Sequence, residues 1–329
     1  MSKSQDIIVL KVIRPKDPIF IAAWPGMGHV ALKSAEYLKS KLGAQLFAKM
    51  PGHRFFHPTD INITNSLILD INLPEGRFYF WQDPNGKHDL IIFIGDQQPP
   101  TEKNAAYAAA ILDFIVPFEA KMVLTFAAVL SSIDHWHSPK VWIAATHQKM
   151  LDDFQTLDAK RMPTGQISGL NGLFLALAKR KKFKGACLLG EIPFYAGTIE
   201  NPKASLAVLH SLMRFLDIRI DLAELSQAVK VMEEEMEKLI AQLQHPINDD
   251  DDDTAPITPE EIEKMRHLLS NHSQIPNSAK RQIEDLFSMA QKDLSTAFEL
   301  KEKLDEWNAY KDYEDRFLEL FKSVDSRDN

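Results

Sequence analysis

The chain has 329 residues, of which 45% are hydrophobic and 26% are charged. This composition is typical of a globular protein, and the length has room for about two domains, which excludes fibrous and wholly disordered classes. No apolar run approaches the roughly 20 residues of a membrane-spanning helix, so we expect no membrane partner. The sequence runs from Met1 into an apolar segment without a secretory signal, which predicts a cytoplasmic location.

Charge and glycine content divide the chain into two regions. Residues 1–222 carry 25 Lys and Arg against 20 Asp and Glu, whereas residues 223–329 carry 13 against 26. No glycine follows Gly197, and glycine is the residue that most readily makes tight left-handed turns. The C-terminal region is therefore predicted to be almost entirely helical. The one cysteine, Cys187, excludes a disulfide within the chain and a cysteine-based zinc site.

Short β-rich runs alternate with helical patterns in the first region. The predicted strands are Ile7–Ile13, Ile19–Trp24, Leu67–Leu73, Phe78–Gln82, Leu90–Gly95, Met122–Ala127, Val141–Ala145 and Ala186–Leu189. The predicted helices are 28–42, 101–116, 147–157, 168–182 and 202–216. Several strands are apolar throughout, as buried central strands are, and Asp83–Lys87 is typical of a tight hairpin turn. The alternation predicts an α/β core with a mixed sheet.

A helical pattern joins the two regions. Apolar residues recur at three- and four-residue steps over 222–243, which predicts a helix packed on the core or on a partner. The acidic run Asp249–Asp253 repels itself and indicates a flexible linker. Helices at 259–270 and 278–322 would form a helical hairpin or coiled-coil-like arm. The predicted organisation is a core at 1–244, an acidic linker at 245–258, an arm at 259–322 and a disordered tail at 323–329.

The sharpest local motif is a strand, a glycine turn and a helix around Gly26-Met27-Gly28-His29. Gly26-x-Gly28-x-x-Ala31 fits the dinucleotide-binding fingerprint, in which glycines let the backbone approach a phosphate. The acidic residue that should end the next strand is missing, because Ala44–Met50 is followed by Pro51-Gly52-His53. Three interpretations stay open: close backbone packing, an anion or small-ligand loop, or an NAD site without its acidic residue.

A second glycine-rich segment, Thr164–Leu173, opens an apolar helix and contains Gly165, Ser168 and Asn171. Glycine in a first helical turn costs about 1 kcal/mol relative to alanine, so this density indicates that another backbone or a ligand packs closely there. Ser168 is most simply a helix cap, because the segment does not match the Gly-x-Ser-x-Gly nucleophile elbow.

Two carboxylates follow predicted strands. Gly190-Glu191 comes directly after Ala186–Leu189, and Gly95-Asp96 ends the run that begins at Leu90. Open α/β sheets bind ligands at the carboxyl ends of their strands. Carboxylates at neighbouring strand ends could do acid–base chemistry, while helix capping and loop hydrogen bonding are the alternative.

Two further clusters suggest chemistry only weakly. His135 and His137, beside Asp134, could reach one metal ion from an extended segment, but no further ligand is assured. The basic run Lys179–Lys182 ends a helix, where it complements the helix dipole, and it lacks the aromatic residues of a nucleic-acid site. With no convincing nucleophile and no P-loop, the sequence predicts no catalytic residue, no metal, no cofactor and no nucleic-acid partner.

Taken together, five motifs resemble the PAC2 family of proteins similar to proteasome assembly chaperones, whose bacterial and archaeal members are sometimes labelled as ATP-grasp superfamily. The motifs are Pro25–Gly28, Thr164–Leu173, Leu188–Tyr195, Asn201–Ala204 and Ile220–Leu222, and the resemblance covers about 15–245. It implies a three-layer α/β/α core with a mixed, mostly parallel sheet, similar to phosphorylase and nucleoside-hydrolase folds. It also implies a protein that assembles with itself or with a relative.

The resemblance further implies a non-enzymatic role, since characterised relatives bind proteasome α-subunits and guide ring assembly. Those relatives dock partly through a C-terminal hydrophobic-Tyr-any tripeptide. The sequence ends in Arg327-Asp328-Asn329, with Tyr310 and Tyr313 internal, so we expect docking by that route to be absent. The expected partners are further copies of the chain and proteasome-like or other protein subunits.

Two hypotheses of function follow. In the first, the chain is a non-enzymatic, oligomeric assembly factor whose glycine turns are structural. In the second, a nucleotide, phosphate or other anion binds at the strand ends. The candidate ligand-binding residues are Gly26, Gly28, His29, Gly95, Asp96, Gly165, Ser168, Asn171, Gly190 and Glu191. In either case the arm at 259–322 could pair subunits or bind a different partner.

Overall fold

The computed structural model describes residues 7–57, 61, 63–155, 157 and 159–244, and shorter pieces at 283, 285–287, 289–290, 296–306, 313, 316–317 and 320. The chain divides into two compact units. The first consists of Met1–Leu130, His135–Ile192 and Ala196–Met236, and the second of Ser131–Asp134, Pro193–Tyr195 and Glu237–Asn329. The predicted linker at 245–258, helix at 259–270 and tail at 323–329 lie outside the described residues, and the core boundary at 244 stays a prediction.

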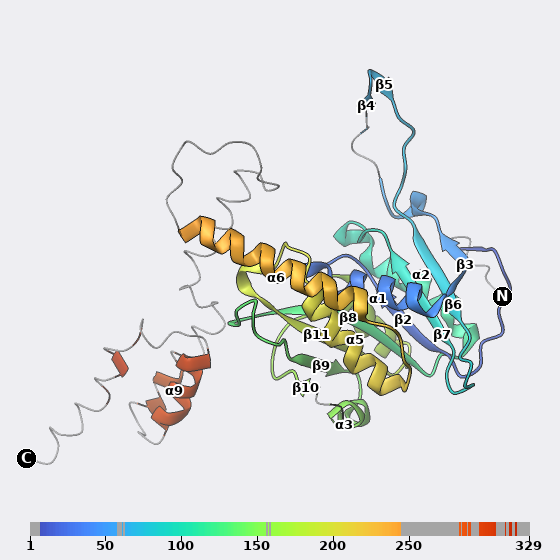
Figure 1. Cartoon of the computed structure of the whole chain (residues 1–329). Helices are drawn as coiled ribbons and strands as arrows, with labels where there is room; N and C mark the ends of the chain where they lie inside the picture. Colours follow the sequence, from blue (N-terminus) through green and yellow to red (C-terminus); the bar gives the residue numbers. More distant parts are fainter. Residues whose placement is uncertain are drawn as a thin grey trace, which may run out of the picture. The chain divides into compact units, whose positions relative to one another are not determined.

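A nine-stranded sheet forms the centre of the first unit (Figure 1). Its strands, in spatial order, are β1 (Ile8–Val9), β3 (Gln45–Met50), β6 (Gly76–Trp81), β7 (Leu90–Gly95), β2 (Ile19–Ala23), β8 (Met122–Ser131), β11 (Gly185–Pro193), β9 (Val141–Ala145) and β10 (Lys160–Arg161). The middle of the sheet is parallel, because β2 runs parallel to both β7 and β8. β6 pairs antiparallel with β3 and β7, and β11 pairs antiparallel with β9. The predicted mixed sheet is confirmed.

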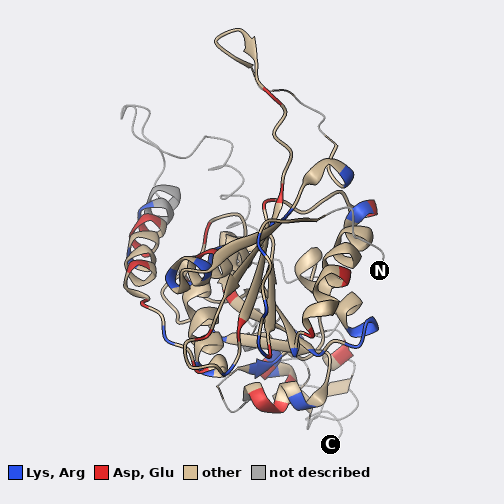
Figure 2. Cartoon of the chain, turned by 90° about the vertical axis from the view of Figure 1, so that its right-hand side faces the viewer, with Lys and Arg blue, Asp and Glu red and all other residues tan. Residues whose placement is uncertain are grey.

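Helices cover both faces of this sheet (Figure 1). α1 (Val30–Leu42) and α5 (Pro202–Leu216) contact each other on one face, and α2 (Thr101–Ile115) and α4 (Leu170–Arg180) contact each other on the opposite face. Figure 2 shows the sheet nearly edge-on between the two helical layers. The predicted three-layer α/β/α core is therefore confirmed.

Two more helices belong to the α1/α5 side of the core. Phe154 of α3 (Gln148–Gln155) and Leu225 of α6 (Ala223–Gln244) are both buried in the cluster on that side. α6 begins within one residue of the helix predicted at 222–243. Among the described residues, no helix is long and apolar enough to cross a membrane.

Side chains alternate along β2 and divide the core in two. Ile19 and Ile21 join the cluster on the α1/α5 side, and Phe20 and Trp24 join the cluster on the α2/α4 side. Successive side chains of a strand point to opposite faces, and all four are at most 1% exposed. Burying a large apolar side chain contributes roughly 1.5–3 kcal/mol, so a strand that is apolar on both faces is stable only between two covering layers.

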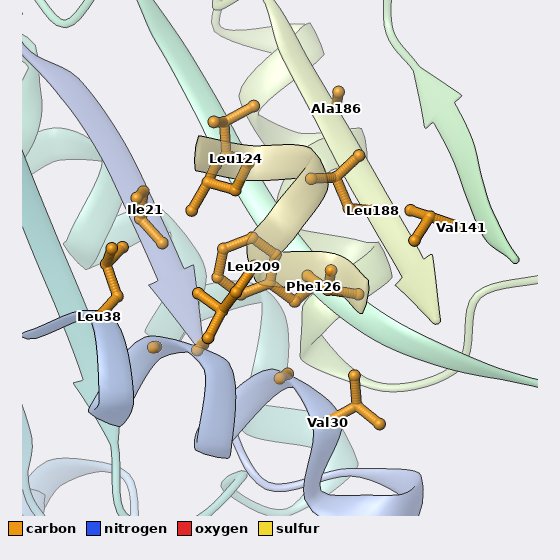
Figure 3. Close-up of a cluster of buried hydrophobic side chains, with 14 of the residues drawn as sticks. Ile21, Val30, Leu38, Leu124, Phe126, Val141, Ala186, Leu188 and Leu209 are labelled. Carbon is orange, nitrogen blue, oxygen red and sulfur yellow. The ribbon is translucent and has the colours of Figure 1, made fainter. Parts of the chain in front are cut away.

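The cluster on the α1/α5 side is mainly aliphatic (Figure 3). Ile21 of β2 and Leu124 of β8 lie close to Leu38 of α1 and Leu209 of α5, and all four are fully buried. The apolar residues of α1 and α5 recur at helical spacing and so form one face of each helix. This face packs on the apolar face of the sheet, which every second residue of a strand forms, and the two patterns together specify this layer.

The cluster on the α2/α4 side is rich in aromatic rings. The Trp24 ring lies 5.4 Å from the ring of Phe93 and 5.2 Å from that of Phe174, measured between centroids. Tilted pairs at such distances are favourable beyond the area they bury. Cys187 of β11 is fully buried in the same cluster, and burial raises the pKa of its thiol to about 12. Its side chain packs as a small core residue.

Two strands predicted from apolar runs are shorter than expected. The run Ile7–Ile13 forms only the two-residue strand β1 at the edge of the sheet. The run Leu67–Leu73 forms only β5 (Leu67–Ile68), which pairs with β4 (Ile63–Thr64) in a separate hairpin. The ends of the runs, Ile7, Ile13 and Leu73, pack against the cluster on the α2/α4 side. The apolar residues between them are largely exposed, so core packing does not explain that part of the pattern.

The predicted turn at Asp83–Lys87 is confirmed, since β6 and β7 on either side of it are antiparallel. The Asp83 carboxylate accepts backbone N–H groups of Asn85 at 2.9 Å, Lys87 at 2.8 Å and His88 at 3.3 Å. The Asp83 N–H in turn donates to the Asp89 carboxylate at 2.9 Å. One buried side chain therefore satisfies three backbone donors of the turn.

The described residues of the second unit form an apolar cluster of their own. Its buried members are Ile283, Phe287, Ala290, Ala297, Leu300, Leu304, Phe317 and Leu320, and its described helix is α9 (Ala297–Glu306). The rings of Phe287 and Tyr313 stack with centroids 5.7 Å apart. A straight helix would separate these two positions by about 39 Å. The prediction of one continuous helix over 278–322 is therefore wrong, whereas the helical-hairpin arm at 259–322 stays a prediction.

Candidate functional site

The turn that follows β2 is tightly packed. Gly28 has a left-handed backbone (φ 58°), its N–H donates to the Gly197 carbonyl at 2.9 Å, and its carbonyl accepts the Asn201 N–H at 2.8 Å. A Cβ at Gly28 would lie 3.3 Å from Asn201 Cβ and 3.3 Å from Ile192 Cδ1. Both the backbone angle and the close neighbours therefore require glycine.

The same turn joins two of the motifs found in the sequence. Asn201, whose N–H is held by Gly28, caps α5 because its side-chain Oδ1 accepts the Ala204 N–H at 2.9 Å. His29 continues the left-handed turn (φ 50°) and is exposed. The segments 25–28 and 201–204 therefore meet through backbone packing.

Gln98 fastens the glycine turn to the start of α4. Its Nε2 donates to the Pro25 carbonyl at 2.7 Å, and its Oε1 accepts the Leu170 N–H at 2.8 Å. Gly169, just before α4, has φ 73°, and a Cβ there would lie 2.6 Å from the Gln98 Oε1. The side chain of Gln98, rather than Ser168, thus satisfies the first donor of the helix, so the expectation that Ser168 caps α4 is wrong.

A hollow of about 280 Å³ lies between these two segments, and we call it the glycine-loop pocket. Its lining residues are Gly26, Met27, Ala31, Gln98, Ala127, Ala128, Gln166, Ile167, Ser168, Gly169 and Asn171. Three predicted ligand-binding residues, Gly26, Ser168 and Asn171, are therefore brought together. All lining side chains, each in the described part of the chain, are uncharged, so a phosphate would find only backbone N–H groups, amides and one hydroxyl there.

Asp96 lies at a different hollow, and the preceding Gly95 packs against the core. A Cβ at Gly95 would lie 2.4 Å from Trp24 Cδ1, so this glycine makes room for a core ring. The Asp96 carboxylate accepts an Arg77 guanidinium N–H at 2.6 Å and the Glu75 backbone N–H at 3.0 Å. Burial alone would lower the pKa of Arg77, but the Asp96 carboxylate raises it, so the guanidinium stays charged. The hollow beside this pair has a volume of about 460 Å³.

Gly190 and Glu191 are buried near the end of β11. A Cβ at Gly190 would lie 2.9 Å from the Ala204 carbonyl oxygen, which shows how closely α5 approaches the strand. The Glu191 side chain, 2% exposed, accepts the Trp142 indole N–H at 2.8 Å and the Lys140 backbone N–H at 2.9 Å. These bonds tie β11 to the start of β9, which is a structural use of the carboxylate.

Gly165 lies at a third hollow, of about 320 Å³, with Thr146, Gly172 and Lys179 among its lining residues. The ten predicted ligand-binding residues are thus spread over three hollows, the packed turn at Gly28 and His29, and buried positions in β7 and β11. β2 and β8 lie between β7 and β11, which places the ends of those two strands about 14 Å apart at the usual 4.8 Å per strand. The hypothesis that Asp96 and Glu191 occupy neighbouring strand ends is therefore wrong.

Two residues of this region were missed by the sequence analysis. Gln98 lies just after Asp96 at the end of β7, and its place beyond a strand end was the signal that could have found it. Lys203 lies inside the motif 201–204, and its Nζ donates to the carbonyls of His135 and Trp136, at 2.8 Å each. It also pairs with Glu233 of α6, so it joins α5, α6 and the segment at 135–136.

The metal hypothesis gains no support from the described residues. Among them, no group of three or more His, Cys, Asp or Glu side chains is placed to hold a metal ion. His135 is 6% exposed, and its ring lies 4.2 Å from that of Trp136. The two histidines that their spacing suggested as ligands thus lie in a segment whose backbone carbonyls accept hydrogen bonds from Lys203.

The sequence profile of the PAC2 family matches residues 20–240. PbaB of Pyrococcus furiosus, an archaeal proteasome activator, has a similar crystal structure with a TM-score of 0.62 and 30% sequence identity, covering 71% of this chain and 97% of that chain. An uncharacterized protein of Methanocaldococcus jannaschii is 26% identical over 233 residues, which cover 70% of this chain and 86% of that protein.

Two more distant structures share the fold. P. furiosus PbaA, an archaeal homolog of proteasome-assembly chaperone, is 22% identical with a TM-score of 0.55, covering 72% of this chain and 98% of that one. A Mycobacterium tuberculosis proteasome-assembly chaperone homologue is 18% identical with a TM-score of 0.58, covering 68% and 95%. The family profile spans most of the chain, and PbaB matches it over nearly the whole of its own length. The chain therefore belongs to the PAC2 family, as the five sequence motifs indicated.

Proposed function

We propose that this chain is a non-enzymatic assembly factor that acts as a homo-oligomer and binds proteasome-like protein subunits. The observation that carries the proposal is the match to PbaB, described as an archaeal proteasome activator, at 30% identity over 97% of that chain. A protein that guides assembly needs surfaces and a rigid core, and it needs no reactive side chain. The proposal includes the cytoplasmic location that the sequence analysis predicts.

The geometry of the glycine-rich motifs supports a structural role for them. Gly28, Gly95, Gly169 and Gly190 each face a neighbouring atom so closely that a Cβ would contact it at 3.3 Å or less. The polar residues beside them, Gln98 among them, are engaged with backbone groups of adjacent segments. Close packing and hydrogen bonds to the backbone therefore explain these glycines and polar residues without any bound ligand.

The second unit is better suited to a separate role than to pairing subunits. Leu300 and Leu304 of α9 are fully buried within that unit's own cluster, so these apolar side chains are already covered. Phe298 of the same helix is 74% exposed. We propose that this unit contacts partner proteins, with Phe298 as part of its contact surface.

The experiment that tests the proposal is native mass spectrometry of the full-length tagged chain, recovered gently from its own host. We expect an oligomer of the chain accompanied by a stoichiometric protein partner. Phe298→Ser is expected to reduce the amount of partner at least tenfold without changing the oligomer. Val231→Ser, a 44% exposed apolar residue of α6, serves as the matched control. A chain that arrives without any partner protein would overturn the proposal.

A second candidate function is the binding of a small uncharged or anionic molecule in the glycine-loop pocket, favoured by the meeting of Gly26, Ser168 and Asn171 there. Ser168→Ala and Gln166→Leu alter exposed lining residues, and neither is one of the residues that fasten the turn. Ser40→Ala and Gln227→Leu make the same changes on exposed helical surfaces. A small molecule that stays bound in the control variants and is lost from the pocket variants would favour this function over the first.

A further inference from the structure

Exposed apolar side chains gather on one projecting hairpin. This apolar hairpin consists of β4, β5 and the flanking residues Ile61, Leu69 and Ile71, and it extends beyond the sheet in Figure 1. Its exposed side chains are Ile61 (52%), Ile63 (64%), Leu67 (69%), Ile68 (69%), Leu69 (45%) and Ile71 (56%). Contiguous apolar patches of several hundred Å² are rare on monomeric proteins and mark interaction sites.

The apolar hairpin presents apolar side chains on both of its faces. Ile63 lies opposite Ile68 across the ladder, and Thr64 lies opposite Leu67, so the two pairs project to opposite faces. The turn between the strands has left-handed backbone at both Asn65 (φ 50°) and Ser66 (φ 64°), which is the type I′ turn that suits a two-residue hairpin. An isolated two-stranded hairpin is only marginally stable in water, so we expect another surface to cover this one.

A second exposed apolar feature lies at the edge of the sheet. Among the described strands, β1 pairs only with β3, so none of them lies along its other hydrogen-bonding edge. The exposed apolar residues in and after this strand are Ile8 (53%), Val9 (52%), Leu10 (54%) and Val12 (82%). Ile8 lies opposite Lys49, one residue before β3 ends, and the chain leads from that end of β3 into the apolar hairpin. An uncovered apolar edge strand is a template for pairing with another chain.

The two features match in charge as well as in apolar character. Asp70 is the only charged residue between positions 61 and 71, and Lys11 is the only one between positions 7 and 13. Both are exposed. In Figure 2 the tip of the apolar hairpin carries neither basic nor acidic colour. A charge-free tip is suited to a dry contact, with one ion pair available at its margin.

We infer that the apolar hairpin is an arm that binds a second copy of this chain, where it covers the exposed edge strand β1. Each copy holds both halves of the contact, so no other partner is needed to bury them. Together they present on the order of 1,000 Å² per copy, close to the roughly 800 Å² that each partner contributes to a stable interface. The inference rests on the self-association in the proposed function and names the surface that produces it.

The first test measures the oligomer by sedimentation velocity over a range of concentrations. Ile63→Thr combined with Ile68→Thr makes one face of the apolar hairpin polar and keeps β-branched side chains, so the hairpin itself is retained. We expect the dissociation constant for self-association to rise at least tenfold. Val116→Thr combined with Val231→Thr, at 49% and 44% exposure, is the matched control and is expected to leave it unchanged.

The second test identifies what the apolar hairpin touches. A photo-cross-linking residue at position 67 is introduced into isotopically heavy chain, which is then mixed with light chain. We expect heavy-to-light cross-links to residues 8–12. Cross-links confined to one copy, to the second unit of another copy, or to a different protein would overturn the inference. Flotation with phosphatidylcholine–phosphatidylglycerol vesicles checks a lipid surface as the alternative occupant, and binding that the Ile63/Ile68 variant loses would also overturn it.

The outcomes separate this inference from the proposed function. An oligomer that is unchanged in the Ile63/Ile68 variant overturns the surface assignment and leaves the assembly-factor proposal standing. An oligomer that dissociates in that variant, from a chain that captures no partner protein, supports the surface assignment and overturns the assembly role. A wild-type chain that is monomeric at every concentration overturns both.

Discussion

The side chain of Asn171 holds both backbone polar groups of Trp24. Its Oδ1 accepts the Trp24 N–H at 3.2 Å, and its Nδ2 donates to the Trp24 carbonyl at 3.3 Å. These residues are 147 positions apart in the chain, and Asn171 is 3% exposed. An amide that mimics a strand neighbour in this way fixes α4 against the end of β2. The same amide lines the glycine-loop pocket, so any ligand there would meet a side chain already engaged.

The Asn171 clamp predicts a large stability loss on its removal. Asn171→Leu keeps the volume of the side chain and leaves the buried N–H and carbonyl of Trp24 without partners. We expect the free energy of unfolding to fall by about 2–4 kcal/mol, since each unsatisfied buried group costs roughly 1–3 kcal/mol. Urea denaturation followed by circular dichroism measures the change. A loss below about 0.5 kcal/mol would show that the clamp is dispensable.

Gly28 predicts a measurable difference between two left-handed glycines. Gly28 and Gly43 have φ values of 58° and 66°, but a Cβ at Gly43 would meet nothing within 4 Å. Gly43→Ala is therefore expected to cost about 1 kcal/mol, from the backbone angle alone. Gly28→Ala is expected to cost at least about 1 kcal/mol more, because its Cβ would press on Asn201 and Ile192. Equal urea midpoints for the two variants would contradict the packed turn.

The bond between Glu191 and Trp142 predicts coupling in a double-mutant cycle. Glu191→Ala and Trp142→Phe each remove one side of the 2.8 Å hydrogen bond. We expect a coupling energy of roughly 1–2 kcal/mol from the unfolding free energies of the two single variants and the double variant. In a control cycle, Trp81→Phe of β6 takes the place of Trp142→Phe, and no coupling with Glu191→Ala is expected. Coupling of the same size in both cycles would refute the specific pair.

The turn at Asp83 predicts a pH-dependent contribution to stability. Burial alone would raise the pKa of Asp83, but the N–H groups of Asn85, Lys87 and His88 outweigh it and hold that pKa below its ordinary value. A carboxyl with a lowered folded pKa stabilises the fold above its unfolded pKa, and this stabilisation is lost as the pH falls through the folded value. Asp83→Asn is expected to cost roughly 1 kcal/mol at pH 7.

The difference between wild type and Asp83→Asn is expected to shrink as the pH falls below about 4, the ordinary pKa of an aspartate. Urea titrations at pH 7, 5 and 3 follow it. Glu234→Gln, on an exposed position of α6, is the control and is expected to change the free energy by less than about 0.5 kcal/mol at each pH. A difference that grows towards pH 3 would have the wrong sign for a lowered pKa.

The sheet and its covering layers could be predicted because local patterns determine them. A run such as Leu90–Gly95, apolar on both faces, is stable only where helices cover both sides of a sheet. Asn201-Pro202 similarly predicts where α5 begins, because an asparagine cap followed by proline favours a helix start. In both cases the sequence pattern that predicts the element lies within a few residues.

The candidate site could be predicted only in part, because its contacts are long-range. Gln98 reaches Leu170 across 72 positions, and no local pattern reports that distance. The separation of Asp96 from Glu191 depends on the order of strands in the sheet, which periodicity does not reveal. The run Leu67–Leu73 was predicted as one strand, and the pattern along the chain does not distinguish exposed from buried apolar residues. Only its exposure in the folded protein identifies it as surface.

The central position of β2 has a consequence for the order in which the protein folds during synthesis. Both hydrogen-bonding edges of β2 are filled by strands made later: Ile19 pairs with Leu90 on one side and with Met122 on the other. About 70 residues must therefore follow this fully apolar strand before its first partner has left the ribosome. β3 and β6 are antiparallel neighbours made in the meantime, and they can pair before β2 has a partner. A nascent chain halted before residue 90 is thus expected to expose this fully apolar strand, the state in which chaperones bind it and aggregation begins.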